Sequence, residues 1–254
     1  MKRKLMTSAL IIAMLAVLVA GASLAYFTDT DTATNTFTVG GVDITLTEPA
    51  WDQNDAHTLM PGASFEKDPT ITVAANSQDC YTFLEIDLNK YVSLINLMGV
   101  DAYKSNIGGL SGTYPGFTAF CEKLISDNDL RVAVVDRWFA GINHSEWEVM
   151  NVADLQAAVA GAADGTNPAH LKVVLGHKGI MKAGEKATFM TAFAMPSTVT
   201  QSMMNGEDAY KINGVSKSNF NTDNSAFKMT FTAYAIQAAE IADLDAAYTA
   251  LFTK

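Results

Sequence analysis

The sequence has few cysteines and few positive charges. Only two of its 254 residues are cysteines, Cys80 and Cys121, which excludes a small disulfide-rich scaffold and a four-cysteine zinc site. It carries 17 Lys and Arg against 27 Asp and Glu, a formal net charge of −10. Nucleic-acid binding needs clustered positive charge, so we expect no nucleic-acid partner. Hydrophobic residues make up 49% of the chain, which is too apolar for a chain disordered throughout.

The sequence also lacks the short motifs of common catalytic sites. The four histidines, His57, His144, His170 and His177, do not form the H-E-x-x-H pattern of a zinc protease. His170 and His177 are seven residues apart on an expected strand, which places them on opposite faces. There is no G-x-S-x-G turn and no phosphate-binding G-x-x-x-x-G-K-[ST] loop. We therefore predict no catalytic residue, no metal ligand and no cofactor.

The first 25 residues have the pattern of a secretory signal peptide. Lys2, Arg3 and Lys4 precede an apolar run from Leu5 to Ala20. Ser23 and Ala25 are small residues at the −3 and −1 positions of a cleavage site before Tyr26. An uncleaved membrane anchor is the alternative, but its apolar run is short for a bilayer, which needs about 20 residues. We expect an exported chain that begins at Tyr26, with no membrane partner after cleavage.

Alternation of apolar and polar residues predicts several strands after residue 38. The clearest is 227–237, and others are expected at 42–46, 69–75, 80–88, 131–140, 144–150 and in two parts of 171–196. Helical spacing is found from Thr118, over 152–164 and over 238–253. The resulting fold class is mainly β, an antiparallel jelly-roll-like β-sandwich with two or three short decorating helices.

The expected domain organisation is simple. A signal peptide covers 1–25, an N-terminal extended segment covers 26–38, and a single β-sandwich domain covers 39–254. The interval 91–169 has the least distinctive pattern and is a candidate helical insertion within that domain.

Several segments together resemble one family. The junction LAYFTDTDTATNTFTVGGVDITL at residues 24–46 is similar to that of the TasA/camelysin-like proteins of biofilm-matrix fibres, which use a dedicated SipW-type signal peptidase. The turn and strand at 60–73 resemble the family's next segment. The segments AGEKATFMTAFAMPS at 183–197 and MTFTAYAIQAAE at 229–240 resemble its late strands.

This resemblance implies secretion, a jelly-roll sandwich and polymerisation in which the N-terminal segment of one subunit completes the sheet of the next. Strand addition at a sheet edge and a head-to-tail contact that does not close would produce a filament. The alternatives are that residues 26–38 pack on their own domain or stay disordered. The candidate donor residues are Tyr26, Phe27, Thr32, Thr34, Thr36 and Phe37.

Three smaller features have two interpretations each. Cys80 and Cys121 either form a disulfide or remain free buried thiols. The acidic clusters at 29–31 and 127–129 could bind calcium, but neither has an EF-hand pattern, and solvated loops explain them better. Trp51, Trp138 and Trp147 could form a sugar-binding platform, although packing in the core is simpler.

The leading functional prediction is a non-enzymatic structural protein of the extracellular matrix or cell surface that assembles into filaments. Its expected partners are further copies of itself, an accessory fibre subunit, and the signal peptidase during export. The alternative is a monomeric adhesion or carbohydrate-binding module. A third alternative, an extracellular metallopeptidase, follows from the classification of camelysin-like relatives rather than from residues of this chain.

Overall fold

The computed structural model describes residues 41–51, 59–164, 169–204, 211–212, 215–216 and 227–253. All of them belong to one compact unit that spans residues 33–254. The predicted signal peptide and the predicted donor segment at 26–38 therefore lie outside the described residues.

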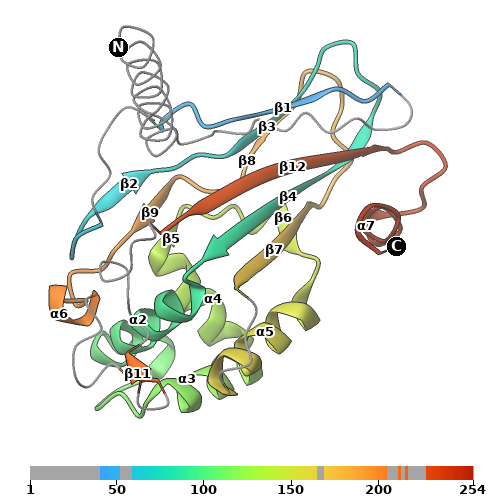
Figure 1. Ribbon diagram of the computed structural model, residues 1–254. Helices are drawn as coiled ribbons and strands as arrows, with labels where there is room; N and C mark the ends of the chain where they lie inside the picture. Colours follow the sequence, from blue (N-terminus) through green and yellow to red (C-terminus); the bar gives the residue numbers. More distant parts are fainter. Residues whose placement is uncertain are drawn as a thin grey trace, which may run out of the picture. The chain divides into compact units, whose positions relative to one another are not determined.

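The largest sheet has four antiparallel strands in the order β12-β4-β7-β6 (Figure 1). Its central strand β4 pairs with β12 along nine residues, from Cys80 opposite Gln237 to Leu88 opposite Met229. The four strands span β4 Cys80–Asn89, β6 Trp147–Val149, β7 His170–His177 and β12 Met229–Gln237.

The second layer is formed by two three-stranded antiparallel sheets, in the orders β1-β3-β8 and β2-β9-β5. Short connections lead from β2 into β3 and from β8 into β9, so the two sheets follow one another in one layer (Figure 1). Two further short strands, β10 and β11, pair with each other. These strands span β1 Ile44–Thr47, β2 Ser64–Glu66, β3 Thr70–Val73, β5 Phe139–Ala140, β8 Lys186–Thr188, β9 Ala192–Ala194, β10 Lys211–Ile212 and β11 Val215–Ser216.

The two layers enclose a hydrophobic core, and the predicted antiparallel β-sandwich is confirmed. Ile71 and Val73 of β3 are fully buried in the same cluster as Leu84 of β4 and Phe231 of β12. Residues of one strand parity point into this core because side chains alternate between the two faces of a sheet. The hydrophobic alternation at 42–46, 69–75, 80–88 and 227–237 therefore identified β1, β3, β4 and β12 correctly.

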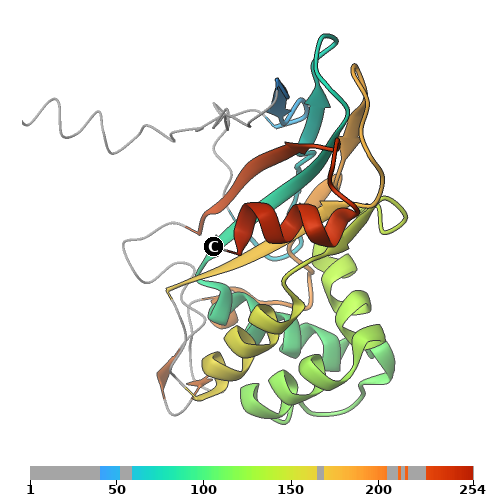
Figure 2. The same cartoon turned by 90° about the vertical axis from the view of Figure 1, so that its right-hand side faces the viewer.

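The chain contains more helix than the two or three helices predicted. Six α-helices are present in the described part, and α2 to α5 gather at one end of the four-stranded sheet (Figure 2). They span α2 Tyr91–Lys104, α3 Phe117–Ser126, α4 Asn128–Trp138, α5 Val152–Asp164, α6 Gln201–Met204 and α7 Leu244–Phe252, and a 3-10 turn η1 covers Ile107–Gly109. Helices α3, α5 and α7 were predicted, whereas α2, α4 and α6 were not.

The strand predicted at 131–140 is wrong, because residues 128–138 form α4 and only Phe139 and Ala140 enter a strand. The side chain of Asp127 accepts a hydrogen bond from the backbone N–H of Leu130 at 2.9 Å and caps the helix. Leu130, Val134 and Trp138 are buried at a spacing of four residues. The strands that do form in the two segments expected at 131–140 and 144–150 are not paired with each other, since β5 pairs with β9 and β6 pairs with β7.

The C-terminal helix α7 covers part of the outer face of the four-stranded sheet (Figure 2). Phe83 of β4 meets the ring of Phe252 at a centroid distance of 5.6 Å, and Tyr234 of β12 meets it at 4.9 Å. Asp243 caps the start of the helix by accepting from the N–H of Ala246. The central sheet is therefore apolar on both faces where α7 lies.

Candidate functional site

The residues predicted for cleavage and strand donation lie outside the described part of the chain. They are Ser23, Ala25, Tyr26, Phe27, Thr32, Thr34, Thr36 and Phe37. The structure does describe β1, which begins at Ile44, shortly after that segment in the sequence. Strand β1 is the first strand in the described part of the chain.

Strand β12 is the longest terminal strand of the described sheets. It is a terminal strand of its sheet as described and runs for nine residues, against three for β6 at the other end of that sheet. Strand β1, the first strand of the other layer, packs next to β12. The first described strand and the long outer strand of the central sheet are therefore neighbours.

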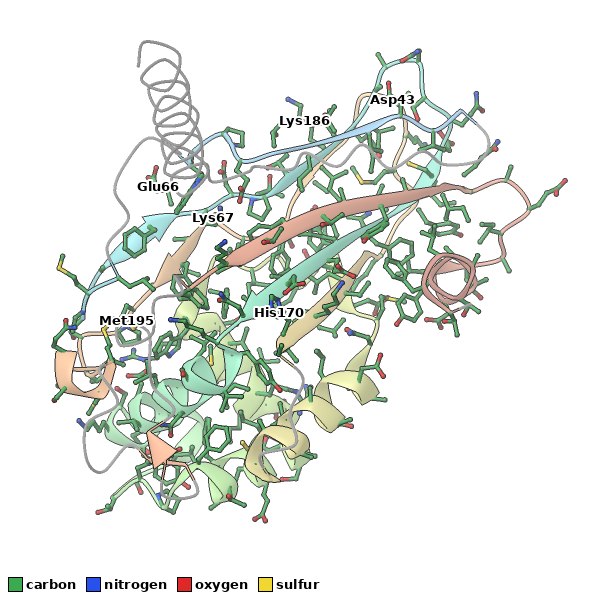
Figure 3. The ribbon with its side chains drawn as sticks, viewed as in Figure 1. Asp43, Glu66, Lys67, His170, Lys186 and Met195 are labelled. Carbon is green, nitrogen blue, oxygen red and sulfur yellow. The ribbon has the colours of Figure 1, made fainter. Side chains whose placement is uncertain are left out.

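The three described histidines do not converge on one point. His144 Nε2 lies 2.7 Å from an oxygen of Asp136. His170, which is labelled in Figure 3, has its Nδ1 2.6 Å from an oxygen of Asp87. His177 Nδ1 lies 2.8 Å from the carbonyl oxygen of Gly179. His170 and His177 occupy opposite faces of β7, as predicted from their spacing. His57 lies outside the described residues.

No group of three or more His, Cys, Asp or Glu side chains that could hold a metal ion is present among the described residues. A catalytic zinc site needs three protein ligands around one metal, and the described histidines each pair with a different region of the fold. These residues do not fit such a site, and we derive no catalytic step through a metal.

Cys80 and Cys121 are both buried free thiols in this structure, which is the second of the two alternatives considered for them. Cys80 begins β4, and Cys121 lies on the buried face of α3. Burial, assisted by the charge of Asp79, raises the pKa of Cys80 to about 11. Burial and the charge of Glu122 raise the pKa of Cys121 to about 12. Both thiols stay protonated at neutral pH and are poor nucleophiles.

Two of the three tryptophans considered for sugar binding lie in the core, and the acidic cluster at 29–31 lies outside the described residues. Trp138 is fully buried with its indole N–H 3.2 Å from Asp101, and Trp147 is 3% exposed with its indole N–H 3.3 Å from the carbonyl oxygen of Thr188. Core packing is therefore confirmed for these two tryptophans. In the acidic cluster at 127–129, Asp127 caps α4, and Asn128 accepts a hydrogen bond from Arg131.

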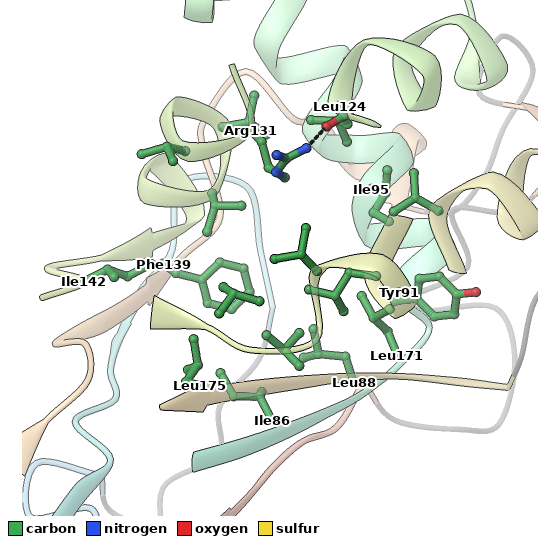
Figure 4. Close-up of a pocket in the computed structure, with 18 of the residues that line it drawn as sticks. Ile86, Leu88, Tyr91, Ile95, Leu124, Arg131, Phe139, Ile142, Leu171 and Leu175 are labelled. Atoms are coloured by element: carbon green, nitrogen blue, oxygen red, sulfur yellow. Dashed lines mark hydrogen bonds between the residues drawn. The ribbon is translucent and has the colours of Figure 1, made fainter. Parts of the chain in front are cut away.

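An apolar cavity of about 320 Å³ lies between the four-stranded sheet and helices α2 to α5 (Figure 4). We call it the sheet–helix cavity. Its floor is formed by inward-facing residues of the sheet, and Arg131 of α4 lies on the opposite side. The floor residues are Ile86, Leu88, Leu171, Val173 and Leu175.

Sequence reasoning missed this cavity. It assigned 131–140 to a strand and left 91–104 without an element, so two of the four helical walls were absent from the predicted fold. The signal that could have identified α4 is the spacing of Leu130, Val134 and Trp138 after a capping aspartate.

Within the described residues, no helix is long and apolar enough to cross a membrane. The segment predicted as a signal peptide is not among them.

Residues 1–80 match the family model described as camelysin metallo-endopeptidase. This stretch contains the junction at 24–46 and the turn and strand at 60–73, two of the segments that carried the resemblance. The two late segments, 183–197 and 229–240, lie outside the match. No curated protein sequence and no solved structure matches the chain. The resemblance to camelysin-like proteins is thus confirmed over residues 1–80.

Proposed function

We propose that this protein is a secreted structural protein of the extracellular matrix or cell surface, and that it polymerises by donating residues 26–38 to the next copy. The family match supports a secreted, matrix-type protein, and it includes the whole of this segment. Donation of the strand and growth into filaments go beyond the match and rest on the arguments that follow.

The observation that carries the proposal is the position of β12. A long outer strand can accept main-chain hydrogen bonds from an added strand, and these give affinity with little dependence on sequence. The outer strands of the other layer are short: β1 has four residues and β8 has three. Strand β12 has nine, which suits a donor segment of 13 residues.

Buried and less buried side chains alternate along β12, so a strand paired with it would also have one inner and one outer face. Phe231, Ala233 and Ala235 are buried toward the core, and Thr230 and Thr232 lie on the other face and are less buried. A donor strand that extends this sheet would place one set of its side chains over the core and the other over the outer face. The threonines of residues 26–38 suit such a half-buried strand, and Tyr26, Phe27 and Phe37 supply apolar anchors.

The geometry also supports an open polymer. The donor segment precedes β1, which lies beside β12. A segment that leaves one subunit and enters the corresponding position of another makes a head-to-tail contact, which continues as a filament unless its rotation closes a ring. An accessory subunit that accepts a strand without donating one would then cap or anchor the polymer.

A competition experiment tests the proposal without altering the fold. A synthetic peptide with the sequence of residues 26–38 is added in molar excess to the mature protein, and filament growth is followed by light scattering. We expect the peptide to slow growth by occupying acceptor sites, while a scrambled peptide of the same composition has no effect. Growth that is equally fast with both peptides contradicts strand donation.

The matching family is described as a metallo-endopeptidase family, which makes that activity a second candidate. The described residues offer no three-ligand metal group, and His57 lies outside them. Cleavage of casein by the purified protein, abolished by a chelator and restored by zinc, would establish that activity. Cleavage unaffected by the chelator would point to a contaminating protease instead.

A further inference from the structure

The rim of the sheet–helix cavity is unusually apolar. Five large hydrophobic residues are exposed among the described residues, and three of them line this cavity: Val132 at 37%, Val149 at 38% and Val152 at 43%. They come from α4, β6 and the start of α5. Exposed apolar side chains that cluster around the opening of an apolar space are typical of a ligand entrance rather than of an ordinary surface.

The interior of the cavity is lined by aliphatic and aromatic side chains. Leu88 and Leu171 form part of the floor, and Tyr91 and Ile95 of α2 stand at one side (Figure 4). The Tyr91 hydroxyl is already engaged with the carbonyl oxygen of Ala158 at 3.4 Å. Water inside an apolar cavity finds few hydrogen-bond partners. The free-energy cost of leaving such a cavity empty grows with its volume.

One cation stands over this apolar space. Arg131 is partly buried, and its Nη1 donates to the carbonyl oxygens of Leu124 and Ile125 at the end of α3, while its Nη2 donates to Asn128 at 3.0 Å. In the described part of the chain it forms no ion pair with a carboxylate. A guanidinium has five N–H donors, so Nε and part of Nη2 can still bind an anion.

The other polar residues along the cavity have partners of their own or are directed away from it, so they would not repel a bound anion. His144 pairs with Asp136, and Gln156 donates to the carbonyl oxygen of Ile125 at 3.3 Å. Glu148 is the one carboxylate residue in the lining, and it is exposed. It alternates with Trp147 and Val149 along β6, so its side chain is directed away from the face that those two residues share. Arg131 is therefore the charged group that decides which head group the cavity accepts.

We propose that the sheet–helix cavity binds a single acyl chain with an anionic head group, whose carboxylate or phosphate pairs with Arg131 at the end of the cavity opposite the sheet. The cavity of about 320 Å³ has room for roughly ten groups the size of a water molecule, at about 30 Å³ each. A methylene is of similar size, so a chain of medium length fills the space. The three exposed valines cover the part of the chain that leaves it.

Calorimetric titration of the mature protein with laurate, below the concentration at which laurate forms micelles, tests the proposal. We expect one laurate per chain. Dodecanol, which has the same chain without the charge, should bind about tenfold more weakly, the ordinary contribution of a charge-assisted hydrogen bond. Lyso-phosphatidylglycerol distinguishes the source of the ligand: tighter binding than laurate identifies a membrane lipid, and weaker binding identifies a free fatty acid.

Variants of Arg131 separate anion binding from its contacts with the end of α3. Arg131→Gln should lower laurate affinity to that of dodecanol and leave dodecanol affinity unchanged, whereas Arg131→Lys, which keeps the charge, should retain most of the laurate affinity. A purely structural role would change the affinities for both ligands together. Equal affinities of the wild-type protein for laurate and dodecanol would overturn the role of Arg131.

Variants of the cavity test where the chain binds. Leu155→Trp in α5 fills the space and should abolish binding of both ligands; Val159→Phe does so with a smaller change if the first variant does not fold. Val152→Ser at the rim should weaken binding, and Ile180→Ser is its matched control, because both side chains are 43% exposed and Ile180 does not line the cavity. Laurate binding that persists in a folded filled-cavity variant overturns the proposal.

Discussion

Asp101 of α2 and Arg137 of α4 form a two-point ion pair inside the helical layer. Arg137 Nε lies 2.6 Å from one carboxylate oxygen, and Nη2 lies 3.0 Å from the other. The Asp101 side chain is 1% exposed, and that of Arg137 is 34% exposed. Asp101 also accepts hydrogen bonds from the Trp138 indole and from the hydroxyls of Ser105 and Thr198. The hydrogen bond to Asp101 raises the pKa of Arg137.

Arg137→Ala should therefore destabilise the fold more than most single substitutions. It leaves the Asp101 carboxylate buried without its cation, and breaking a buried pair typically costs about 3 to 5 kcal/mol. Because Arg137 is partly exposed and three neutral donors remain, we expect a loss of about 2 to 3 kcal/mol in the free energy of unfolding. Urea denaturation at pH 7 measures it.

The control for this substitution is a pair on the surface. Asp136 and His144 are 2.7 Å apart, but their side chains are 41% and 49% exposed. Asp136→Ala should cost less than about 1 kcal/mol, as exposed pairs usually do. Equal losses for Arg137→Ala and Asp136→Ala would show that the Asp101 network does not hold the helices together.

The buried thiols predict a loss of stability in alkaline solution. Their pKa values are raised in the folded protein to about 11 for Cys80 and about 12 for Cys121, from 9.0 for an unperturbed thiol. Above pH 9 the unfolded chain releases these protons while the folded chain keeps them, so the free energy of unfolding falls as pH rises from about 9 to 12. Each thiol contributes a slope of up to about 1.4 kcal/mol per pH unit.

Denaturation curves from pH 8 to 11 of the wild type, Cys80→Ala and Cys121→Ala measure this dependence. Each substitution should make the decline shallower, and the double variant should show the smallest slope. Tyr114, whose pKa is also raised by burial, adds to the decline above pH 10 and remains in all variants. A slope that is the same in all four proteins would mean that the thiols are not buried in solution.

Gly99 is required where α2 crosses α3 and the preceding loop. A Cβ atom at this position would lie 2.7 Å from Phe120 Cδ1 and 2.8 Å from Tyr114 Cε2. Phe120 is fully buried, and the Tyr114 hydroxyl donates to Asn96 at 2.9 Å, so neither ring moves easily. Overpacking costs about 1 to 3 kcal/mol, while alanine gains about 1 kcal/mol over glycine in a helix.

We therefore expect Gly99→Ala to lower the free energy of unfolding by up to about 2 kcal/mol, against the ordinary preference for alanine in helices. Phe120→Leu makes room for the added methyl group. The double variant should lose less stability than the sum of the losses in the two single variants, and a double-mutant cycle measures this difference. A stabilised Gly99→Ala variant would contradict the close crossing.

Much of the sandwich could be predicted from sequence because its strands have one buried and one exposed face. In β12, Phe231, Ala233 and Ala235 alternate with threonines and Tyr234, and a period of two identifies such a strand directly. Helix α5 was predicted from its alanine content and spacing. These elements have local patterns that agree with their tertiary surroundings.

The helical layer could not be predicted in the same way. In α4, the β-branched Val132, Val134 and Val135 favour a strand locally, but the Asp127 cap and the burial of Leu130, Val134 and Trp138 select a helix. Helix α2 is buried along almost its whole length, so its apolar residues show no clear stripe. The sheet–helix cavity depends on both helices and was missed with them.

If residues 26–38 drive assembly, their removal must abolish filaments, and negative-stain electron microscopy of two proteins measures this. One protein spans residues 26–254 and the other spans 39–254, and both are incubated at rising concentration. We predict filaments from the first protein and folded, cooperatively unfolding monomers from the second. Equal filaments from both proteins would contradict strand donation, and so would a 26–254 protein that stays monomeric with its segment bound to its own sheet.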